Sequence, residues 1–323
     1  MTSTSNTTGP SRPPRPTCVV VVTYEATAVL GGLLDSLAAS AGGDHVPVLV
    51  VDNGSRDGTA SIVRARDGIA LIEQLNTGYA HGVNRGIEAA PKGHDILVLN
   101  PDVLVAKDAI VRLSAVLEGY PDVGVVAPAL FAPDGTISPS LRREPRAVAT
   151  WIEALVGGDR AGRFGERFTP CGDELVDADW VTGAAMLLRR ETVERLGGFS
   201  EAFFMYSEET EYCLRVKDAG ERIVCAPLAR MTHQGGQMGT DPRLWALRAV
   251  NRVRLQSHRR GRWAGFCMRL AGLAFETRRA LTRKTVSRAA VMALLRPNLD
   301  TMAAELVRQL GGETRPMLVG TKQ

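Results

Sequence analysis

The stretch CVVVVTYE, residues 18–25, decides the fold class of this 323-residue chain. It begins as an uninterrupted apolar, β-branched run and ends in polar residues, and similar apolar runs occur at residues 46–51 and 96–99. Continuous runs of this kind are typical of strands that are buried on both faces of a parallel sheet. We therefore predict three parallel strands in the first hundred residues.

Helical patterns lie between the predicted strands. Asp57 stands where it is able to cap a short helix through Arg66. A longer apolar helix face is formed by Val29, Leu30, Leu33, Leu34 and Leu37. The alternation over the first 120 residues predicts right-handed βαβ units and a doubly wound α/β sheet, whose ligand site lies at the carboxyl ends of the strands. Function is therefore expected in the loops that follow the strands.

The second half of the chain has a less regular pattern. Asp134 and Gly135 form a turn signal inside a predicted hairpin at residues 131–137. Residues 142–173 show weak periodicity, and we interpret them as a loop-rich lid over an acceptor. The remaining expected elements are a strand at 181–188, helices at 191–196 and 208–219, and a helical region from residue 241 onward.

Composition excludes several classes of protein. With 45% hydrophobic and 23% charged residues, the chain is not disordered, collagen-like or a coiled coil. The best candidate for a membrane span, residues 263–275, is shorter than the roughly 18 apolar residues required and contains Arg269. The five cysteines lie far apart without a CxxC pair, so we expect reduced thiols in cytoplasm. Residues 1–17 lack an apolar segment, which indicates a disordered leader.

The net charge of +4 conceals an asymmetry along the chain. Residues 1–242 contain 22 Lys and Arg against 31 Asp and Glu, whereas residues 243–323 contain 17 against 4. The acidic body, without an aromatic-interleaved RNA motif, argues against nucleic-acid binding. We interpret the basic tail either as a peripheral contact with anionic membrane or as a helical lid or homodimer contact.

Polar residues follow the predicted strands. The first strand ends without a GxGxxG sequence, which argues against a dehydrogenase. Asp52 follows the second strand, where a carboxylate is able to accept hydrogen bonds from a nucleoside, although a polar turn with a helix cap has the same sequence. The glycines of residues 76–87 permit close approach of a base or diphosphate. Asn100 and Asp102 follow the third strand and offer the oxygen ligands that suit a divalent cation bridging diphosphate oxygens.

Seven motifs in one order resemble the family 2 glycosyltransferases, and specifically their rhamnosyltransferase-like branch. They extend from about residue 19 to residue 239 and read VVTYE, VVDNGSRDGT, NTGYAHGVNRGI, LNPDV, VTGAAMLLRR, GGFSEAFFMYSEETEYCLR and THQGG. The resemblance implies a GT-A fold, with a Rossmann-like, mostly parallel sheet, over residues 18–240 and a basic helical extension at 241–323. It also implies inverting transfer from a nucleoside-diphosphate sugar with Mg2+ or Mn2+.

The resemblance assigns roles to individual residues. The residues that it implies in nucleotide-sugar binding are Thr23, Tyr24, Glu25, Asp52, Asn76, Gly78, Asn84, Asn100 and Asp102. It implies that Asp102 and His233 hold the metal ion. Asn100 replaces the first carboxylate of the usual Asp-x-Asp sequence, so the metal ion is expected to be bound more weakly by the protein and largely by the donor diphosphate.

Glu208 and Glu209 form the predicted catalytic pair. The family pattern places its general base at the second position of an acidic pair, usually Asp, which is Glu209 here. Carboxylates in the first turn of a helix also interact favourably with its dipole, by about 0.3–1 kcal/mol each, and this structural explanation accounts for at least one of them. From the helix N-terminus we expect Glu209 to be ionised at neutral pH and ready to take a proton.

The substrates follow from the same resemblance. The acceptor side is expected at Trp180 and Gly183, although Trp180 is explained equally well as ordinary core. The expected donor is dTDP-rhamnose, and the acceptor is a glycan, a lipid-linked saccharide or a small molecule. A nucleotidyltransferase is an alternative, but residues 23–30 lack its Gly-rich, Arg-containing loop. A catalytically silent sugar-nucleotide or membrane-surface binding module is another, because Asn100 and Glu209 depart from the family pattern.

Overall fold

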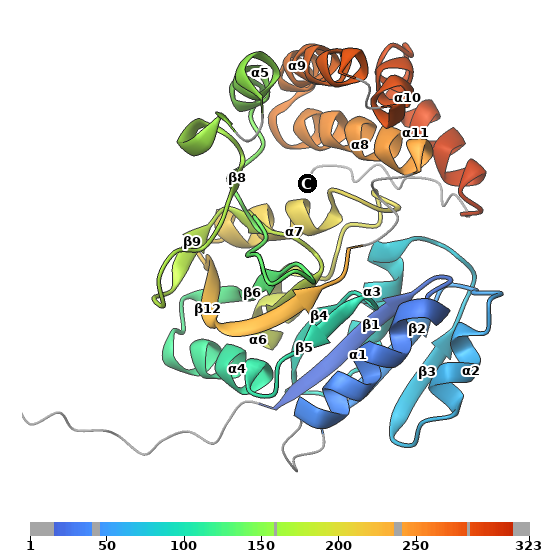
Figure 1. Cartoon of the computed structure of the whole chain (residues 1–323), viewed down its shortest axis with the longest axis vertical. Helices are drawn as coiled ribbons and strands as arrows, with labels where there is room; N and C mark the ends of the chain where they lie inside the picture. The colour runs from blue at the N-terminus through green and yellow to red at the C-terminus, as the bar shows by residue number, and fades with distance from the viewer. Residues whose placement is uncertain (1–15, 41–45, 158–159, 236–240, 283–284, 313–323) are drawn as a thin grey trace, which may run out of the picture.

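The computed structural model describes residues 16–40, 46–157, 160–235, 241–282 and 285–312. These residues form a nine-stranded sheet with helices on both faces, and a group of C-terminal helices lies beyond α7 (Figure 1). The order of the sheet is β3-β2-β1-β4-β11-β6-β12-β5, with β9 paired to β12. Most of the expected leader lies outside the described residues, although Thr17 already belongs to β1.

The N-terminal half contains the predicted parallel strands. They are β1 (Thr17–Thr23), β2 (Val48–Asp52) and β4 (Asp95–Leu99), and a fourth parallel strand that the sequence did not predict, β3 (Ile69–Glu73), pairs with β2. The helices between them are α1 (Thr27–Ser40), α2 (Thr59–Arg64) and α3 (Tyr79–Ala89). Asp57 lies one residue before the N-cap Gly58, but its carboxylate still accepts a hydrogen bond from the Thr59 amide at 3.0 Å. The register pairs Thr23 with Asp52, so these two strand ends meet at one edge of the sheet.

The second half adds both parallel and antiparallel strands to this sheet. Its strands are β5 (Val103–Val105), β6 (Val123–Phe131), β9 (Val176–Ala178), β11 (Ala185–Leu188) and β12 (Arg222–His233). Its helices are α4 (Ala109–Gly119), α6 (Arg190–Leu196) and α7 (Glu208–Asp218). β11 runs antiparallel between β4 and β6, which makes the sheet mixed. The predicted hairpin turn is confirmed by an antiparallel bridge between Phe131 and Ile137.

Two apolar layers hold the helices against the sheet. α1, α2 and α4 cover one face through buried residues such as Leu33, Val63 and Leu113. α3, α6 and α7 cover the other face, where Val83 and Tyr212 are among the buried residues. The doubly wound α/β architecture predicted from the sequence is thus confirmed, and α3 and α7 meet on the face that carries the site.

The prediction of one strand at residues 181–188 is wrong. The segment is divided into β10 (Trp180–Val181), in a second, three-stranded sheet, and β11 in the main sheet. Between them the Thr182 amide donates to the Ser140 carbonyl at 3.2 Å, and the Ala184 carbonyl accepts from the Asn100 amide at 2.9 Å. The chain therefore changes sheets at Gly183, which apolar residues on both sides concealed in the sequence.

The middle segment is also more ordered than predicted. It contains β7 (Leu141–Arg142), α5 (Ala147–Val156), the 3-10 turn η2 (Gly162–Phe164) and β8 (Arg167–Phe168). β7 joins β10 and β8 in the small sheet. α5 packs against α9 (Arg262–Leu281). This contact with a helix more than one hundred residues away stabilises a segment whose own sequence pattern is weak.

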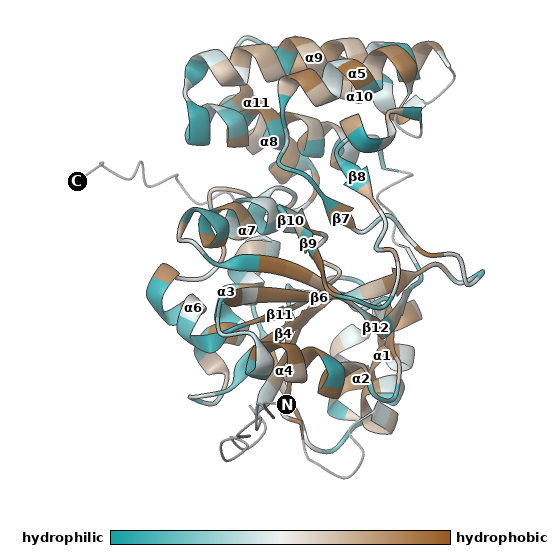
Figure 2. Cartoon of the chain, turned by 90° about the vertical axis from the view of Figure 1, so that its left-hand side faces the viewer, coloured by the Kyte–Doolittle hydropathy of each residue, from teal (hydrophilic) through white to brown (hydrophobic). Residues whose placement is uncertain are grey.

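The expected C-terminal helical region is confirmed within its described residues. Besides α9 it consists of α8 (Pro242–Arg260), α10 (Thr285–Leu294) and α11 (Leu299–Gln309). Buried residues including Leu247, Val250, Leu294 and Leu306 form its core. These helices and α5 lie together at the end of the molecule remote from α4 (Figures 1 and 2). Among the described residues, no helix is long and apolar enough to cross a membrane.

Candidate functional site

Thr23 and Asp52 lie together where β1 and β2 end. Both are buried, and the Thr23 hydroxyl donates to Asp52 Oδ1 at 2.8 Å. Asp52 also accepts hydrogen bonds from the hydroxyl of Ser55 and, at 2.9 Å through Oδ2, from its amide. A carboxylate offers about four lone-pair sites, so this arrangement fixes Asp52 and leaves acceptor capacity for a ligand.

Tyr24 and Glu25 continue from β1 into solvent. Tyr24 is exposed, and Glu25 is an exposed residue with a φ of 50°, a left-handed conformation that is uncommon for a residue with a side chain. The Glu25 amide donates to Ser55 Oγ at 2.8 Å, which ties this turn to the loop after β2. Strained backbone of this type occurs often at ligand sites, and a role in nucleotide-sugar binding stays a prediction for both residues.

The motif at residues 76–87 is only partly directed at this edge. Gly78 has a φ of 107°, and a Cβ built there would lie 2.6 Å from the Phe204 carbonyl, so glycine permits close contact with the loop before α7. The Asn84 amide group donates to the Phe199 carbonyl at 2.9 Å and accepts from the Phe199 amide at 2.8 Å. Asn84 therefore anchors the residues before α7, whereas Asn76 is half-buried in the loop before α3.

Asp102 and His233 are brought together as predicted. The register of β5 and β12 pairs Val103 with His233, and His233 Nε2 lies 3.2 Å from Asp102 Oδ2. Asp102 is buried, and its backbone carbonyl accepts from the Gln234 amide at 3.0 Å. The described residues contain no group of three or more His, Cys, Asp or Glu placed to hold a metal ion. A carboxylate and an imidazole fit a divalent cation that takes its other ligands from water and phosphate oxygens.

Tyr79, which the sequence analysis did not single out, connects the two halves of the site. Its hydroxyl lies 3.2 Å from Asn100 Oδ1 and 3.2 Å from the Gly183 carbonyl, and is able to donate to either. Burial raises the pKa of Tyr79 well above its ordinary value, and the charges of Glu208, Glu209 and Asp102 act in the same direction. Tyr79 thus lies near the acidic pair and near Asp102.

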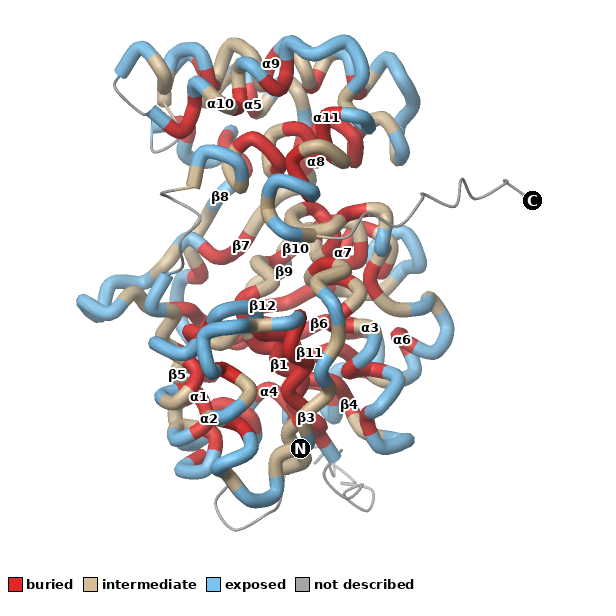
Figure 3. Tube along the Cα trace, turned by 90° about the vertical axis from the view of Figure 1, so that its right-hand side faces the viewer, coloured by how far each residue is buried: buried red, intermediate tan, exposed pale blue. Residues whose placement is uncertain are grey.

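Glu208 and Glu209 begin α7, which lies between the sheet and α8 (Figure 3). Their Oε2 atoms are both buried, with no hydrogen-bond partner among the described residues. Burial raises the pKa of Glu209, and the amides at the start of the helix and the charge of Arg142 lower it by less. Burial, reinforced by the charge of Glu209, raises the pKa of Glu208 well above its usual range. The helix N-terminus does favour ionisation of Glu209, as expected, but burial outweighs it.

Gly183, which the sequence analysis expects on the acceptor side, lies against Glu209 of the acidic pair. A Cβ built on Gly183 would lie 3.5 Å from Glu209 Cβ and 3.6 Å from Glu209 Cγ. The Asn100, Tyr79 and Gly183 contacts therefore lead without interruption from the end of β4 to Glu209. A general base and a leaving-group site at opposite ends of one substrate are what group transfer to a hydroxyl requires.

The loop that carries the acidic pair is strained and is held by the C-terminal helices. Tyr206 and Ser207 have φ values of 67° and 81°, in the left-handed region. Asn251 of α8 is fully buried, and its side-chain amide donates to the carbonyls of Met205 and Tyr206 at 2.9 and 3.3 Å. Sequence reasoning missed Asn251 because a single polar residue within a long helical pattern carries no motif.

Arg142, which the sequence analysis did not single out, lies beside Trp180. The small sheet pairs Arg142 with Trp180 on one side and with Arg167 on the other, so these three side chains lie on one face. The Arg142 guanidinium lies over the Trp180 ring at 5.5 Å and donates to the carbonyls of Pro139 and Leu141. Burial lowers the pKa of Arg142 to about 10, so it remains protonated at neutral pH. Among the described residues it forms no ion pair.

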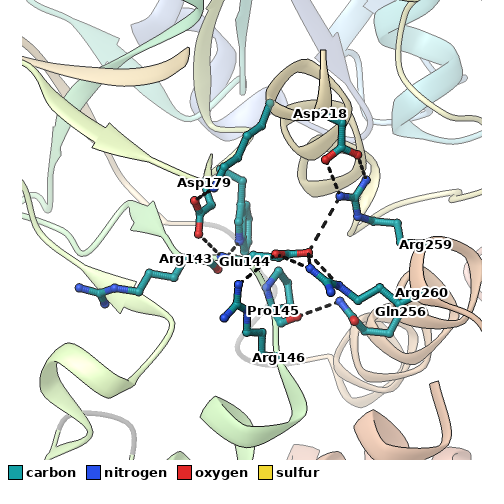
Figure 4. Close-up of polar contacts among 11 residues, drawn as sticks. Arg143, Glu144, Pro145, Arg146, Asp179, Asp218, Gln256, Arg259 and Arg260 are labelled. Atoms are coloured by element: carbon teal, nitrogen blue, oxygen red, sulfur yellow. Dashed lines mark hydrogen bonds and ion pairs between the residues drawn. The ribbon is translucent and has the colours of Figure 1, made fainter. Parts of the chain in front are cut away.

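Residues 143–146 attach the face of the small sheet that carries Arg142 and Trp180 to α8. Glu144 binds Arg260, with Oε1 and Oε2 at 2.7 and 2.8 Å from Nη2, while its amide donates to Asp179 Oδ2 at 2.7 Å (Figure 4). The Gln256 side chain donates to the Pro145 carbonyl at 2.8 Å, and Trp180 Nε1 donates to the Arg143 carbonyl at 3.0 Å. Trp180 is therefore part of a rigid wall of the site, and its core-like packing does not exclude contact with substrate.

Comparison with known proteins shows the family of the chain. Residues 13–264 match the family described as glycosyltransferase like family 2. The chain is 31% identical, over 69% of its length and 78% of the relative's, to the N-acetylglucosaminyl-diphospho-decaprenol L-rhamnosyltransferase of Mycobacterium tuberculosis.

Two solved structures share the fold. A mannosyltransferase from Pyrobaculum calidifontis in complex with GDP-Man and Mn2+ is similar at a TM-score of 0.54 and 21% identity, over 92% of this chain and 85% of that chain. GalNAc-T7 with UDP, GalNAc and Mn2+ has a TM-score of 0.54 and 15% identity, over 74% of this chain but only 48% of its own. The GT-A fold expected from the sequence is confirmed.

Proposed function

Because the chain belongs to the family 2 glycosyltransferases, of the rhamnosyltransferase-like kind, we propose that it transfers rhamnose from dTDP-rhamnose to an acceptor hydroxyl with inversion. The observation that carries this proposal is the run of contacts from Asn100 through the Tyr79 hydroxyl and Gly183 to Glu209, with the Asp102–His233 pair two residues along the chain from Asn100. It supports one bound sugar between a diphosphate and a base. Family membership also favours a glycosyltransferase over a nucleotidyltransferase or a catalytically silent binding module.

The donor nucleoside belongs, in this proposal, at the ends of β1 and β2. Thr23 fixes the Asp52 carboxylate, whose remaining lone pairs accept hydrogen bonds from the nucleoside. Tyr24, Glu25, Asn76 and Asn100 surround this edge. Asn84 and Gly78 act indirectly in this proposal, because they hold the loop before α7 against α3 and do not themselves contact the nucleoside. The dTDP-rhamnose assignment follows the rhamnosyltransferase relative.

Asp102 and His233 are the residues that would hold Mg2+ or Mn2+. The cation supplies neutralisation of the charge that develops on the departing diphosphate. Asp102 is fixed for this role by the Gln234 amide, which donates to its carbonyl, and by the pairing of β5 with β12. With two protein ligands, metal affinity is expected to rise strongly when the donor diphosphate is bound.

Glu209 acts as the general base in this proposal. Its carboxylate takes the proton of the acceptor hydroxyl while that oxygen attacks the anomeric carbon from the face opposite the nucleoside diphosphate, so the configuration inverts. The buried position makes the carboxylate more basic than an exposed one, which suits proton transfer near neutral pH. The neighbouring Glu208, with its strongly raised pKa, retains a proton more readily and keeps the pair from carrying two charges.

The proposed acceptor is a lipid-linked saccharide that carries a diphosphate. The name of the Mycobacterium tuberculosis relative specifies such an acceptor, N-acetylglucosaminyl-diphospho-decaprenol. In this chain Arg142 offers a protonated guanidinium beside Trp180 and within electrostatic reach of Glu209. A planar guanidinium recognises phosphate through paired hydrogen bonds, while Trp180 provides an aromatic surface for a sugar ring.

Product analysis tests the proposal. The protein is incubated with Mg2+, dTDP-rhamnose and a diphosphate-linked N-acetylglucosamine acceptor, and the product is examined by mass spectrometry and by NMR of its anomeric centre. We expect release of nucleoside diphosphate, a deoxyhexose mass increment and an inverted anomeric configuration. Release from UDP-glucose but not from dTDP-rhamnose would overturn the donor assignment, and a retained configuration would overturn the role of Glu209.

A further inference from the structure

Two helices at the end of the molecule remote from the sheet carry exposed apolar stripes. On α9, Trp263, Phe266 and Leu270 occupy one face and are between 43% and 75% exposed, while Gly265, Met268 and Ala271 face inward. The Trp263 and Phe266 rings stack on each other with their centroids 5.5 Å apart. Three large apolar residues at i, i+3 and i+7 that face solvent are the reverse of the arrangement that stabilises a helix on a core.

α5 repeats this arrangement beside α9. Val148, Trp151 and Leu155 have the same spacing and are between 40% and 75% exposed. Thr150 Oγ1 lies 3.6 Å from Met268 Sδ, and Arg278 Nη1 lies 3.3 Å from the Glu153 carbonyl, so the two helices run side by side in the same direction. Figure 2 shows apolar residues along both helices at this end of the molecule. The two packed helices thus present a surface with six large exposed apolar side chains, which exceeds the scattered exposure that is usual for soluble proteins.

The charges around this apolar surface have one sign. Exposed cations on or next to these helices include Arg262 and Arg278 of α9, Arg163 of the turn η2 after α5, and Arg288 of α10. Among the described residues these four form no ion pair with a carboxylate. α5, α9 and α10 together contain only two acidic residues, of which Glu276 is buried and Glu153 is half-buried. Arg262 even stands in the first turn of α9, where the helix dipole disfavours a cation, so helix stability does not explain its presence.

We propose that the α5–α9 surface, formed by Val148, Trp151, Leu155, Trp263, Phe266 and Leu270, binds the surface of an anionic lipid bilayer. The apolar side chains enter the boundary between headgroups and acyl chains, where tryptophan is favoured, and the arginines lie at the level of the lipid phosphates. Charge complementarity selects this partner, since a second copy of the same surface would bring unpaired arginines against arginines.

This inference differs from the membrane contact expected of the basic tail as a whole. Much of the tail is structural, because α8 and α11 contribute the C-terminal core and Asn251 holds the loop before Glu209. Arg259 and Arg260 are occupied by Asp218 and Glu144. The surface instead includes α5, which lies outside the tail. Deleting residues 243–323 would therefore damage the site and would not test lipid binding.

Cosedimentation with vesicles tests the surface directly and needs neither donor nor acceptor. The full chain is mixed with vesicles of equal phosphatidylglycerol and phosphatidylcholine, and with vesicles of phosphatidylcholine alone. The test variants are Trp263→Ser/Phe266→Ser and Val148→Ser/Leu155→Ser, with Val111→Ser/Tyr120→Ser, on α4 and at its C-cap, as the matched control. We expect each test pair to lower the partition coefficient by about tenfold or more, and the control pair to leave it unchanged.

Charge variants and self-association complete the test. Arg163→Gln/Arg262→Gln should weaken binding to the anionic vesicles by about tenfold, whereas Lys92→Gln/Lys107→Gln should not. Equal binding of the parent chain and the α5 or α9 variants would overturn the proposal, as would equal binding to neutral and anionic vesicles. If the parent chain does not bind vesicles but forms a dimer in analytical ultracentrifugation, and the Trp263→Ser/Phe266→Ser variant is a monomer, then a second copy covers the surface and the proposal is wrong. Because lipid binding is measured without turnover, failure of the proposed glycosyl transfer would leave this result unaffected.

Discussion

Replacing Asn251 by alanine should disable the enzyme from a position that touches no substrate. The Asn251 side chain donates to the carbonyls of Met205 and Tyr206 and accepts from Arg254 Nη1 at 2.7 Å. Two neutral hydrogen bonds contribute about 1 kcal/mol each and the bond to a charged group about 1.5–3 kcal/mol, so about 3.5–5 kcal/mol of local stability is lost. Left-handed residues such as Tyr206 and Ser207 cost about 1–3 kcal/mol each and persist only while their surroundings hold them.

The expected consequence is a loss of kcat of about a hundredfold, because a displacement of about 1 Å at a reacting group is sufficient for that loss. Glu209 is two residues from the strained Ser207, whereas Thr23 and Asp52 lie on other elements, so the donor Kd should remain unchanged. Steady-state transfer assays and calorimetric titration with donor, well below the unfolding temperature, measure the two quantities separately.

Asn298→Ala is the matched control for this experiment. Asn298 caps α11 by accepting from the Asp300 and Thr301 amides at 3.0 Å, so its loss costs about 1 kcal/mol in the same helical region without touching the loop. It should lower thermal stability and preserve kcat. The reasoning would be refuted by an Asn251→Ala protein that keeps its kcat within about twofold, or by equal losses of kcat in both variants.

Three further predictions concern the acidic pair, the proposed metal ligand His233 and the proposed acceptor contact Arg142. Burial raises the folded-state pKa values of Glu208 and Glu209, so their contribution to stability is full below the unfolded-state pKa and is lost as pH rises through the folded-state pKa. Glu208→Gln should therefore raise the unfolding temperature relative to the parent chain at pH 8 but not at pH 4. A change in unfolding temperature that is the same at both pH values would contradict the burial argument. His233→Ala should raise the Mg2+ or Mn2+ concentration needed for half-maximal activity while Asp102 still binds, and an unaltered metal titration would remove His233 from the site. Arg142→Gln should raise the KM for a diphosphate-linked acceptor by about 10–100-fold with no change in donor Kd, whereas an equal effect on an uncharged acceptor would argue against phosphate recognition.

The sequence predicted the parallel half of the fold well because its signals are local. Continuous apolar runs specify β1, β2 and β4; β1 and β2 end at Thr23 and Asp52, and Asn100 directly follows β4. Asp102 and His233 were paired by family pattern, and the β5–β12 register brings them within 3.2 Å.

The missed features depend on contacts between distant parts of the chain. α5 is stable because it packs on α9, and the break at Gly183 arises because Thr182 and Ala184 bond to different sheets. The raised pKa of Glu209 has the same origin. Its position at a helix N-terminus was visible in the sequence, but its burial results from packing with segments that are distant in the chain. Asn251 and Arg142 acquire their roles only from that packing.

The central claim is that Glu209 takes the acceptor proton while the donor is held elsewhere in the same pocket. Glu209→Gln keeps the size of the side chain and removes the base. We predict a loss of kcat of about 10²–10⁴-fold, with a calorimetric donor Kd within about threefold of the parent chain. Glu211→Gln is the matched control, since Glu211 begins the same helix but pairs with Arg215 at 2.9 Å, and its kcat should be nearly unchanged. Full transfer activity in Glu209→Gln, or a loss of donor affinity as large as the loss of turnover, would contradict the account.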